Sequence, residues 1–436
     1  MLIKILHITA HVGGGVGKAL SGLVAQASVS GSGARHLIVC LEEPEKRQFV
    51  DRIRECGGEV IVRPGKDGTE KLLRDSDIVQ LEWWNHPETI KQLCTLAVPP
   101  IRLLTWSHVS GIHNPIIPQG LMSASHRFLF TSPCSFESKE VMGLMPELGD
   151  RLGVVSSSGG FSGLPESVGE SNKGISAGYI GSLNFAKLHP NYVDYLATID
   201  IPGFRVKMIG DLTNQDILNQ QCDNLGKTGM LDFRGYTTDI VSELASINVL
   251  AYLLNPEHYG TTENALIEAM AMGIVPIVLD NPAERRIVDD HNTGLIVRSP
   301  DEFAKAIKWL SENPADRQRM GRQASKSVRE RFSAEKMEAA LNGHYQSILS
   351  MEKRKIVFSE IFGADPAEWF LSCQRDRTIF AEDGSISLNN NNRLGYGLFE
   401  KSKGTVFHFS GHFPDNLKLK LWAKNLESLQ HCSQTR

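Results

Sequence analysis

The sequence predicts an α/β protein with two Rossmann-like halves, each built on a parallel, doubly wound sheet. Short apolar runs alternate with helical patterns in the first part of the chain, and a second series of the same kind begins near residue 175. Continuous apolar strands between helices are typical of parallel sheets that helices cover on both faces. The length of 436 residues agrees with two halves, because it is too long for one hydrophobic core.

The apolar runs and helical patterns place the elements in order. Strands of the first half are expected at IKILHIT, HLIVCL, EVIVR, DIVQLEWW, IRLLTWSH and RFLFTS, and its first helices at GKALSGLVAQAS and EKRQFVDRIREC. Strands of the second half are expected at ISAGYIGSL, FRVKMIGDL, LDFRGY, INVLAYLL, IVPIVLD and GLIVRS. The helix TENALIEAMAMG lies between two of these strands, with Gly273 as its expected C-cap.

These patterns divide the chain into a first domain over 1–165, a second domain over 174–335, a closing helix over 336–352 and an extension over 353–436. Residues 154–174 are rich in Ser and Gly and are interpreted as the linker. In the extension, GTVFHFSGHF is interpreted as a strand and LKLKLWAKNLESL as an amphipathic helix. We expect the extension to be a small addition packed on the second half.

Composition excludes several classes of protein. The formal net charge of -4 gives no electrostatic reason to expect nucleic acid. Seven scattered cysteines without a CxxC pair indicate reduced thiols in a cytoplasmic protein and no metal site. MLIKILHITA is interpreted as a strand and not a signal peptide, and no apolar run reaches the roughly 18 residues of a membrane span. Peripheral contact with the inner face of a membrane and the oligomeric state stay open.

The glycine-rich stretch HVGGGVGKAL follows the first predicted strand. It fails as a Walker A loop, because Val12 replaces the first glycine and Ala19 replaces the magnesium-binding hydroxyl. It fails as a dinucleotide fingerprint, because the third glycine, counted from the start of the run, falls on Lys18. Glycines before a helix N-terminus still favour close approach of an anion, so Gly14 and Gly15 are candidate phosphate contacts. A tight turn without a ligand is the alternative.

In the second half, YGTTENALIEA leads from a loop into a helix. The unpaired amides of a helix N-terminus favour an anion such as a nucleotide pyrophosphate. Thr261 and Thr262 can add hydroxyl donors to that anion. Glu268, about one turn inside the helix from Glu263 and Asn264, can accept hydrogen bonds from ribose hydroxyls.

The segments NALIEAMAMGIVPIV and NTGLIV resemble the retaining glycosyltransferases of the GT-B fold, family 4, also called glycosyl transferases group 1. Weaker matches extend over roughly residues 1–350. The resemblance implies two Rossmann-like domains facing a cleft, no metal and no cofactor. It also implies a UDP- or GDP-sugar donor as substrate, and a glycan, a lipid-linked glycan or a small molecule as acceptor.

The resemblance assigns roles around this donor loop. It places Glu268 on the ribose. The first Glu of the family's paired-Glu motif falls on Gly260 in an ungapped count, whereas a small insertion makes Glu257 the match. Glu263 could replace that Glu functionally, and Gly260 to Glu263 would then form the donor loop.

Two further segments resemble donor-binding motifs of the family. GYIGSLNFAK retains the Lys that neutralises the leaving diphosphate, at Lys187, but places Ser182 where the family has Arg. This departure leaves one cation fewer against the diphosphate. LDFRGY places Tyr236 where the family holds the nucleotide base.

The first half supplies candidates for the acceptor side. His108 follows a strand end, where ligands of such sheets bind, and the family often has a His there near the donor sugar. His113 is a second candidate. Trp83 and Trp84 could form a platform for a sugar, although core packing explains them equally well.

The implied reaction is glycosyl transfer with retention of configuration. The acceptor hydroxyl attacks on the face of the departing phosphate, which takes the proton, while Gly15 and Lys187 stabilise the diphosphate. The catalytic candidates are His108, Lys187, Glu257 and Glu263. Three alternatives stay open: a catalytically impaired nucleotide-sugar-binding subunit, which Ser182 motivates, and a sugar-nucleotide epimerase or a sugar phosphorylase on the same architecture.

Overall fold

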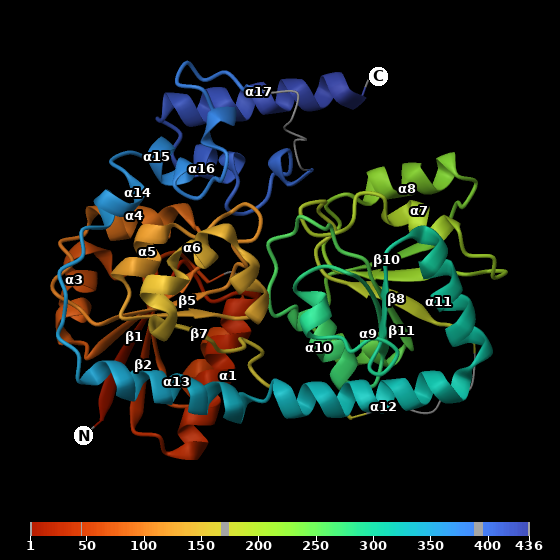
Figure 1. Cartoon of the computed structure of the whole chain (residues 1–436), viewed down its shortest axis with the longest axis horizontal. Coiled ribbons are helices and arrows are strands. Elements are labelled where there is room, and N and C mark those ends of the chain that lie inside the picture. Colours follow the sequence, from red (N-terminus) through yellow and green to blue (C-terminus); the bar gives the residue numbers. More distant parts are fainter. Residues whose placement is uncertain (1, 45, 167–173, 388–395, 435–436) are drawn as a thin grey trace. The chain divides into compact units, whose positions relative to one another are not determined.

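The computed structural model describes residues 2–44, 46–166, 174–387 and 396–434. The chain divides into two compact units (Figure 1). The first unit comprises Met1–Gly159 together with Ala334–Arg436, and the second comprises Gly160–Ser333. The first unit is therefore discontinuous in sequence, and the second is inserted into it.

The first unit contains a seven-stranded parallel sheet in the order β3-β2-β1-β4-β5-β6-β7. Its strands are β1 (Ile3–Thr9), β2 (Ala34–Cys40), β3 (Glu59–Val62), β4 (Ile78–Trp83), β5 (Leu103–Ser107), β6 (Arg127–Phe130) and β7 (Leu152–Val154). The strand order reverses between β1 and β4. In doubly wound sheets, the carboxyl ends of the strands beside such a reversal form the ligand-binding crevice.

Helices cover this sheet. They are α1 (Gly14–Ser30), α2 (Arg47–Glu55), α3 (Gly65–Asp75), α4 (Pro87–Thr95), α5 (Gln119–Ala124), α6 (Lys139–Leu148) and the closing helix α13 (Ala334–Leu349). The extension adds α14 (Phe358–Phe362), α15 (Pro366–Leu371), α16 (Val406–His412) and α17 (Leu417–Gln434). Short 3-10 turns lie at η1 (Pro133–Glu137), η2 (Gly149–Arg151), η4 (Arg377–Ile379) and η5 (Tyr396–Leu398).

The second unit contains a six-stranded parallel sheet in the order β10-β9-β8-β11-β12-β13. Its elements are β8 (Ala177–Ile180), α7 (Tyr192–Ala197), β9 (Val206–Ile209), α8 (Gln215–Asn224), β10 (Leu231–Gly235), α9 (Ile240–Ala245), β11 (Val249–Tyr252), α10 (Asn264–Ala271), β12 (Val275–Leu279), η3 (Glu284–Arg286), β13 (Leu295–Val297), α11 (Pro300–Glu312) and α12 (Pro314–Arg331). All six strands lie where the apolar runs predict them. Gly273 follows α10 with φ 79°, as expected for its C-terminal end.

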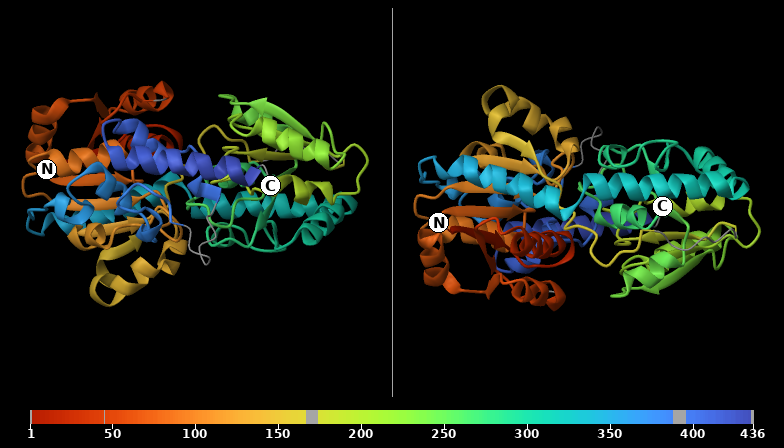
Figure 2. Two further views of the ribbon diagram at one scale, coloured as in Figure 1. Left: turned by 90° about the horizontal axis from the view of Figure 1, so that it is seen from above. Right: turned by 90° about the horizontal axis from the view of Figure 1, so that it is seen from below.

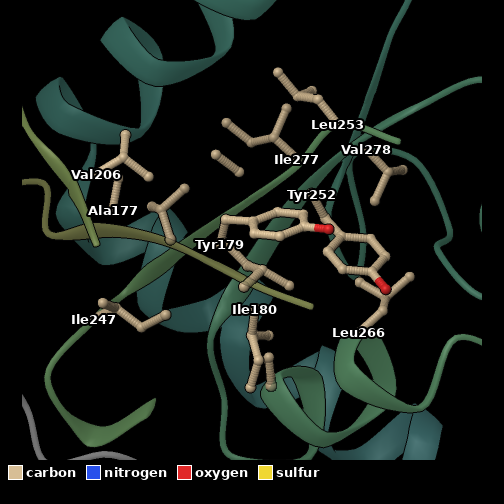
Figure 3. Close-up of a cluster of buried hydrophobic side chains, with 14 of the residues drawn as sticks. Ala177, Tyr179, Ile180, Val206, Ile247, Tyr252, Leu253, Leu266, Ile277 and Val278 are labelled. Carbon is tan, nitrogen blue, oxygen red and sulfur yellow. The ribbon is translucent and has the colours of Figure 1, made fainter. Parts of the chain in front are cut away.

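In the core of the second unit, Tyr179 and Tyr252 lie among aliphatic side chains from β8, β11, β12 and α10 (Figure 3). The rings of Tyr179 and Tyr252 lie nearly parallel, with centroids 5.8 Å apart. Their hydroxyls leave the apolar cluster for polar partners. Tyr179 donates to the Ser182 carbonyl at 2.8 Å, and Tyr252 donates to Glu263 Oε2 at 2.7 Å. The core thus reaches directly to the predicted donor loop.

The start of the predicted linker belongs to the first unit. Val155 and Ser158 are buried, and the Val155 carbonyl accepts a 2.9 Å hydrogen bond from the Trp106 indole. Gly159 approaches α1 so closely that a Cβ on Gly22 would lie 2.2 Å from the Gly159 carbonyl oxygen. Composition alone favoured a linker here because small residues are typical both of loops and of close backbone contacts.

Two predictions for the extension are wrong. The segment interpreted as a strand contains the helix α16, and the extension packs on the first unit instead of the second. Helices α14, α15 and α16 contact α4, and Figure 2 shows the blue helices of the extension against the orange helices of the same unit. The amphipathic helix at the C-terminal end is confirmed as α17, where Leu419, Trp422 and Leu426 are buried.

Among the described residues, no helix combines the length and apolarity that a membrane crossing requires.

Candidate functional site

The donor loop of the second unit ends at Glu263, which begins α10 from a left-handed backbone with φ 48° and ψ 63°. This conformation costs a residue other than glycine on the order of 1–3 kcal/mol, and it is typical of functional sites. The Glu263 side chain is 2% exposed. Both of its carboxylate oxygens lie 2.6 Å from Lys187 Nζ, and Oε2 also accepts the Tyr252 hydroxyl. The strained turn therefore places a carboxylate directly on the predicted phosphate-binding lysine.

Gly260 lies directly against this ion pair. A Cβ at this position would lie 1.8 Å from Glu263 Oε1 and 2.5 Å from Lys187 Nζ, so no other residue fits without displacing the pair. Its backbone N–H donates to His258 Nδ1 at 3.0 Å. His258 therefore carries its proton on Nε2, which lies 3.1 Å from the buried Glu284 carboxylate. These contacts fix the loop on which a ligand would rest.

The charges of the pair are mutually stabilised. Burial raises the pKa of Glu263, but the Lys187 ammonium and the Tyr252 hydroxyl outweigh burial, and the pKa of this carboxyl lies below its usual value. Burial likewise lowers the pKa of Lys187, but the Glu263 carboxylate outweighs it and raises the pKa of the ammonium. The ammonium also lies 5.7 Å from the centroid of the Tyr259 ring. Lys187 is thus a cation held in place before any ligand arrives.

Other donor candidates lie around the pair in the same unit. Thr261 and Thr262 are buried in the loop, and Asn264 Oδ1 is a buried acceptor without a hydrogen-bond partner at the first turn of α10. Glu268 lies one turn further along α10 and is partly exposed. Tyr236 follows β10 and is 58% exposed.

Ser182, at the position where the resembled family has arginine, is held by neighbouring polar groups. Its hydroxyl accepts the Asn184 amide at 2.6 Å. It also donates to Asp211 and so helps to lower the pKa of that carboxyl, against the opposing effect of burial. Asp211 further accepts the Thr213 amide N–H at 3.0 Å. The position therefore carries a hydroxyl and a neighbouring carboxylate in place of a cation.

The structure separates the two candidates for the first Glu. Glu257 is exposed, and its backbone N–H donates to Asn255 Oδ1 at 2.9 Å. Glu263 instead contacts Lys187. The role proposed for Glu257 stays a prediction, and the geometry favours Glu263.

In the first unit, the candidates lie at the end of β4 or in the segments that follow β1, β4 and β5. The exposed Gly14 and Gly15 form the first turn of α1, which begins three residues earlier than the helical pattern indicated. His108 Nε2 lies 2.7 Å from Glu82 Oε2. His113 follows β5 in a loop and is partly exposed.

The two tryptophans of the proposed sugar platform differ. Trp83 is fully buried and stacks on Phe362 of the extension, with centroids 5.3 Å apart, so its ring belongs to the core. Trp84 is partly exposed and packs edge-on against His11 and His86. Only Trp84 of the two keeps an exposed surface.

One group among the described residues, Glu42, Glu88 and His412, brings together side chains of the types that bind metals. His412 Nε2 lies 2.8 Å from Glu88 Oε2, and its Nδ1 lies 3.5 Å from Glu42 Oε1. The imidazole thus lies between the two carboxylates and links the extension to the rest of the first unit.

Sequence reasoning missed the partners of the candidates, namely Tyr252, His258 and Glu284 in the second unit and His7, Gln80 and Glu82 in the first. A signal existed for three of them. His7, Gln80 and Glu82 are polar residues inside otherwise apolar strands, and a buried polar side chain requires a hydrogen-bond partner.

Residues 164–327, which make up nearly all of the second unit, match the family model of the glycosyl transferases group 1. The chain is also similar to the lipopolysaccharide core biosynthesis glycosyltransferase LpsE of Rhizobium meliloti, with 26% identity over 141 residues. This match covers 32% of the present chain and 41% of LpsE, so it spans less than half of either protein.

Two solved structures share the fold. A glycosyltransferase from Rickettsia africae superimposes with a TM-score of 0.61 and 15% identity, over 80% of this chain and 99% of that one. Anabaena HepE, solved in complex with UDP and glucose, superimposes with a TM-score of 0.60 and 16% identity, over 79% of this chain and 100% of HepE. The predicted fold class, with two Rossmann-like domains of the GT-B type, is confirmed. The second unit is similar to group 1 glycosyltransferases along nearly its whole length.

Proposed function

We propose that the chain is a retaining glycosyltransferase that moves a sugar from a nucleotide-sugar donor to an acceptor hydroxyl. One observation carries this proposal: the Lys187 ammonium, paired with the buried Glu263, lies at the start of α10 inside the segment that matches the glycosyltransferase model. A fixed cation beside the free amides of a helix N-terminus suits a diphosphate.

Each residue of the site in the second unit has a separate role in binding the donor. Lys187 offsets the negative charge that develops on the diphosphate as the glycosidic bond breaks. Glu268 accepts hydrogen bonds from the ribose hydroxyls. Glu263 holds Lys187 in place, so that little reorganisation is needed when the charge develops. The departing phosphate itself takes the proton of the acceptor hydroxyl.

We propose a UDP-hexose as donor and a bacterial surface polysaccharide or lipid-linked glycan as acceptor. The UDP and glucose bound to HepE and the lipopolysaccharide role named for LpsE support these choices. An acceptor of that kind would bring the protein to the inner face of a membrane as a peripheral protein.

Incubation with UDP- and GDP-sugars and a panel of lipid-linked and free glycans tests the proposal. We expect release of nucleoside diphosphate together with a glycoside that has the anomeric configuration of the donor. A product with inverted configuration would exclude a retaining mechanism.

The second candidate is a nucleotide-sugar-binding subunit without turnover. It is favoured by Ser182, because Asp211 beside it contributes a negative charge where the family has a positive one. Tight donor binding without release of nucleoside diphosphate, across the whole acceptor panel, would favour this function over transfer.

A further inference from the structure

A network of buried polar side chains lies in the first unit, whereas the Lys187–Glu263 pair belongs to the second. At its centre is Glu82 on β4, which is 0% exposed. Glu82 Oε2 lies 2.7 Å from His108 Nε2, after β5, and Oε1 lies 2.9 Å from His7 Nδ1, on β1. Because β1, β4 and β5 are neighbours in the sheet, these contacts span the strand ends beside the reversal of strand order.

Further partners fix Glu82. Gln80 Nε2 donates to Glu82 Oε1 at 2.8 Å, and Gln80 Oε1 accepts the hydroxyl of the buried Tyr345, on α13, at 2.6 Å. On the other side, His7 Nε2 lies 2.9 Å from His36 Nδ1. We call these six residues, His7, His36, Gln80, Glu82, His108 and Tyr345, the Glu82 network.

The protonation of the network follows from these contacts. Burial raises the pKa of Glu82, but the hydrogen bonds from His108 and His7 outweigh burial and lower it, so the carboxyl is ionised. An ionised carboxylate can only accept hydrogen bonds. His108 must therefore present a proton on Nε2, and His7 a proton on Nδ1.

We propose that Glu82 is a positioning residue that fixes the tautomer of His108, leaving Nδ1 as the ring nitrogen that contacts a sugar hydroxyl of the substrate. This inference rests on the proposed function, with His108 contacting a sugar hydroxyl as the family resemblance implies. The Glu82 side chain is fully buried, whereas that of His108 is 8% exposed, so Glu82 acts through His108 and His108 meets the substrate.

The chemical consequence is a defined hydrogen-bond polarity at the substrate. With the proton held on Nε2, neutral His108 offers a lone pair at Nδ1 and accepts a hydrogen bond from a hydroxyl. In the opposite tautomer, Nδ1 would donate instead and Nε2 would face the carboxylate with a lone pair. Buried carboxylates hold catalytic imidazoles in one tautomer in this way.

The substitution Glu82→Gln tests this inference. The Gln amide can place its NH2 either toward His108 or toward His7 and Gln80. If the NH2 faced His7 and Gln80, it would meet two hydrogen-bond donors. If it faces His108, it meets only one. We expect the NH2 to face His108, and the proton of neutral His108 to move to Nδ1.

Nitrogen-15 NMR of histidine-labelled protein reads the tautomer directly, with the His108 signal identified by its loss in His108→Gln. We expect the Nε2–H form in the wild type and the Nδ1–H form in Glu82→Gln. The matched control is Glu338→Gln, another buried Glu of this unit, which accepts the Ser30 hydroxyl at 3.0 Å and should leave the signal unchanged. The Nδ1–H form of His108 in the wild type would overturn the inference even if Glu82→Gln fails to fold.

Kinetics provide the second readout. We expect Glu82→Gln to lower kcat about 100-fold, with donor KM within about twofold, and to add no loss in a His108→Gln background. Additive losses, or a wild-type kcat in Glu82→Gln, would overturn the positioning role. A wild type without transferase activity would contradict the proposed function alone, because the NMR measurement still decides what Glu82 does.

Discussion

Lys187 and Glu263 neutralise each other inside the second unit, so removing one partner does more harm than removing both. Lys187→Met leaves the Glu263 carboxylate, whose side chain is 2% exposed, without its cation. We expect a loss of about 3 kcal/mol in the free energy of unfolding, because an orphaned buried charge keeps its desolvation cost. Lys187→Met/Glu263→Gln should recover most of that loss. Urea unfolding measures both, and the exposed Lys305→Met is the control.

The same pair makes the free energy of unfolding depend on pH at an acidic and at an alkaline limit. The pKa of Glu263 is lowered from 4.5, so its contribution to stability is present above that value and is lost as the pH falls through the lower, folded pKa. The pKa of Lys187 is raised from 10.5, so its contribution is present below that value and is lost as the pH rises through the higher, folded pKa. The stability difference between wild type and Lys187→Met/Glu263→Gln should be constant between these limits. A difference that declines near neutral pH would contradict the ion pair.

At the residue scale, the sequence predicted two residues that the structure brings together, Lys187 and Glu263, but not the hydrogen-bond partners that hold them. Lys187 and the loop from Gly260 to Glu263 were predicted from motif spacing and helix N-terminal chemistry. The choice between Glu257 and Glu263 depends on a loop whose path follows from His258 and a strained turn. Spacing along the chain does not encode such a path, because three or four loop residues can turn in several ways.

At the scale of elements, two close backbone contacts join helices to loops. A Cβ added to Gly22 of α1 would lie 2.2 Å from the Gly159 carbonyl oxygen. A Cβ added to Gly321 of α12 would lie 2.2 Å from the Gly273 carbonyl oxygen. We expect Gly22→Ala to destabilise the protein by about 2 kcal/mol through overpacking. Gly143→Ala, in α6, meets only the Gln119 side chain at 3.4 Å and should stabilise it by about 0.5 kcal/mol. Thermal unfolding compares the two, and equal shifts would contradict the contact.

Continuous apolar runs predicted every strand of the second sheet, because buried parallel strands leave a strong signal. They failed at α16. Val406 and Phe409 are buried at helical spacing there, yet the segment is too short to separate that spacing from the alternation of a strand. The three-residue β7 was missed for the same reason.

At the scale of the whole molecule, the insertion of the second unit into the first decides which fragments fold. The second unit has its own sheet and core within 160–333. The segment 1–159 depends on the returning chain, since α13 packs on α1 and buries Leu341 and Tyr345. We expect the isolated fragment 160–333 to unfold cooperatively and 1–159 to do so only when 334–436 is supplied. Circular dichroism during heating checks this, and a stable 1–159 alone would refute it.

Calorimetric titration with UDP and GDP shows whether the Lys187–Glu263 site binds the donor diphosphate. One of the two nucleotides should bind the wild type and the Lys305→Met control equally well. It should bind Lys187→Met/Glu263→Gln, which leaves no orphaned charge, at least about 30-fold more weakly. Equal affinity for the double variant, or no binding of either nucleotide to the wild type, would contradict the account.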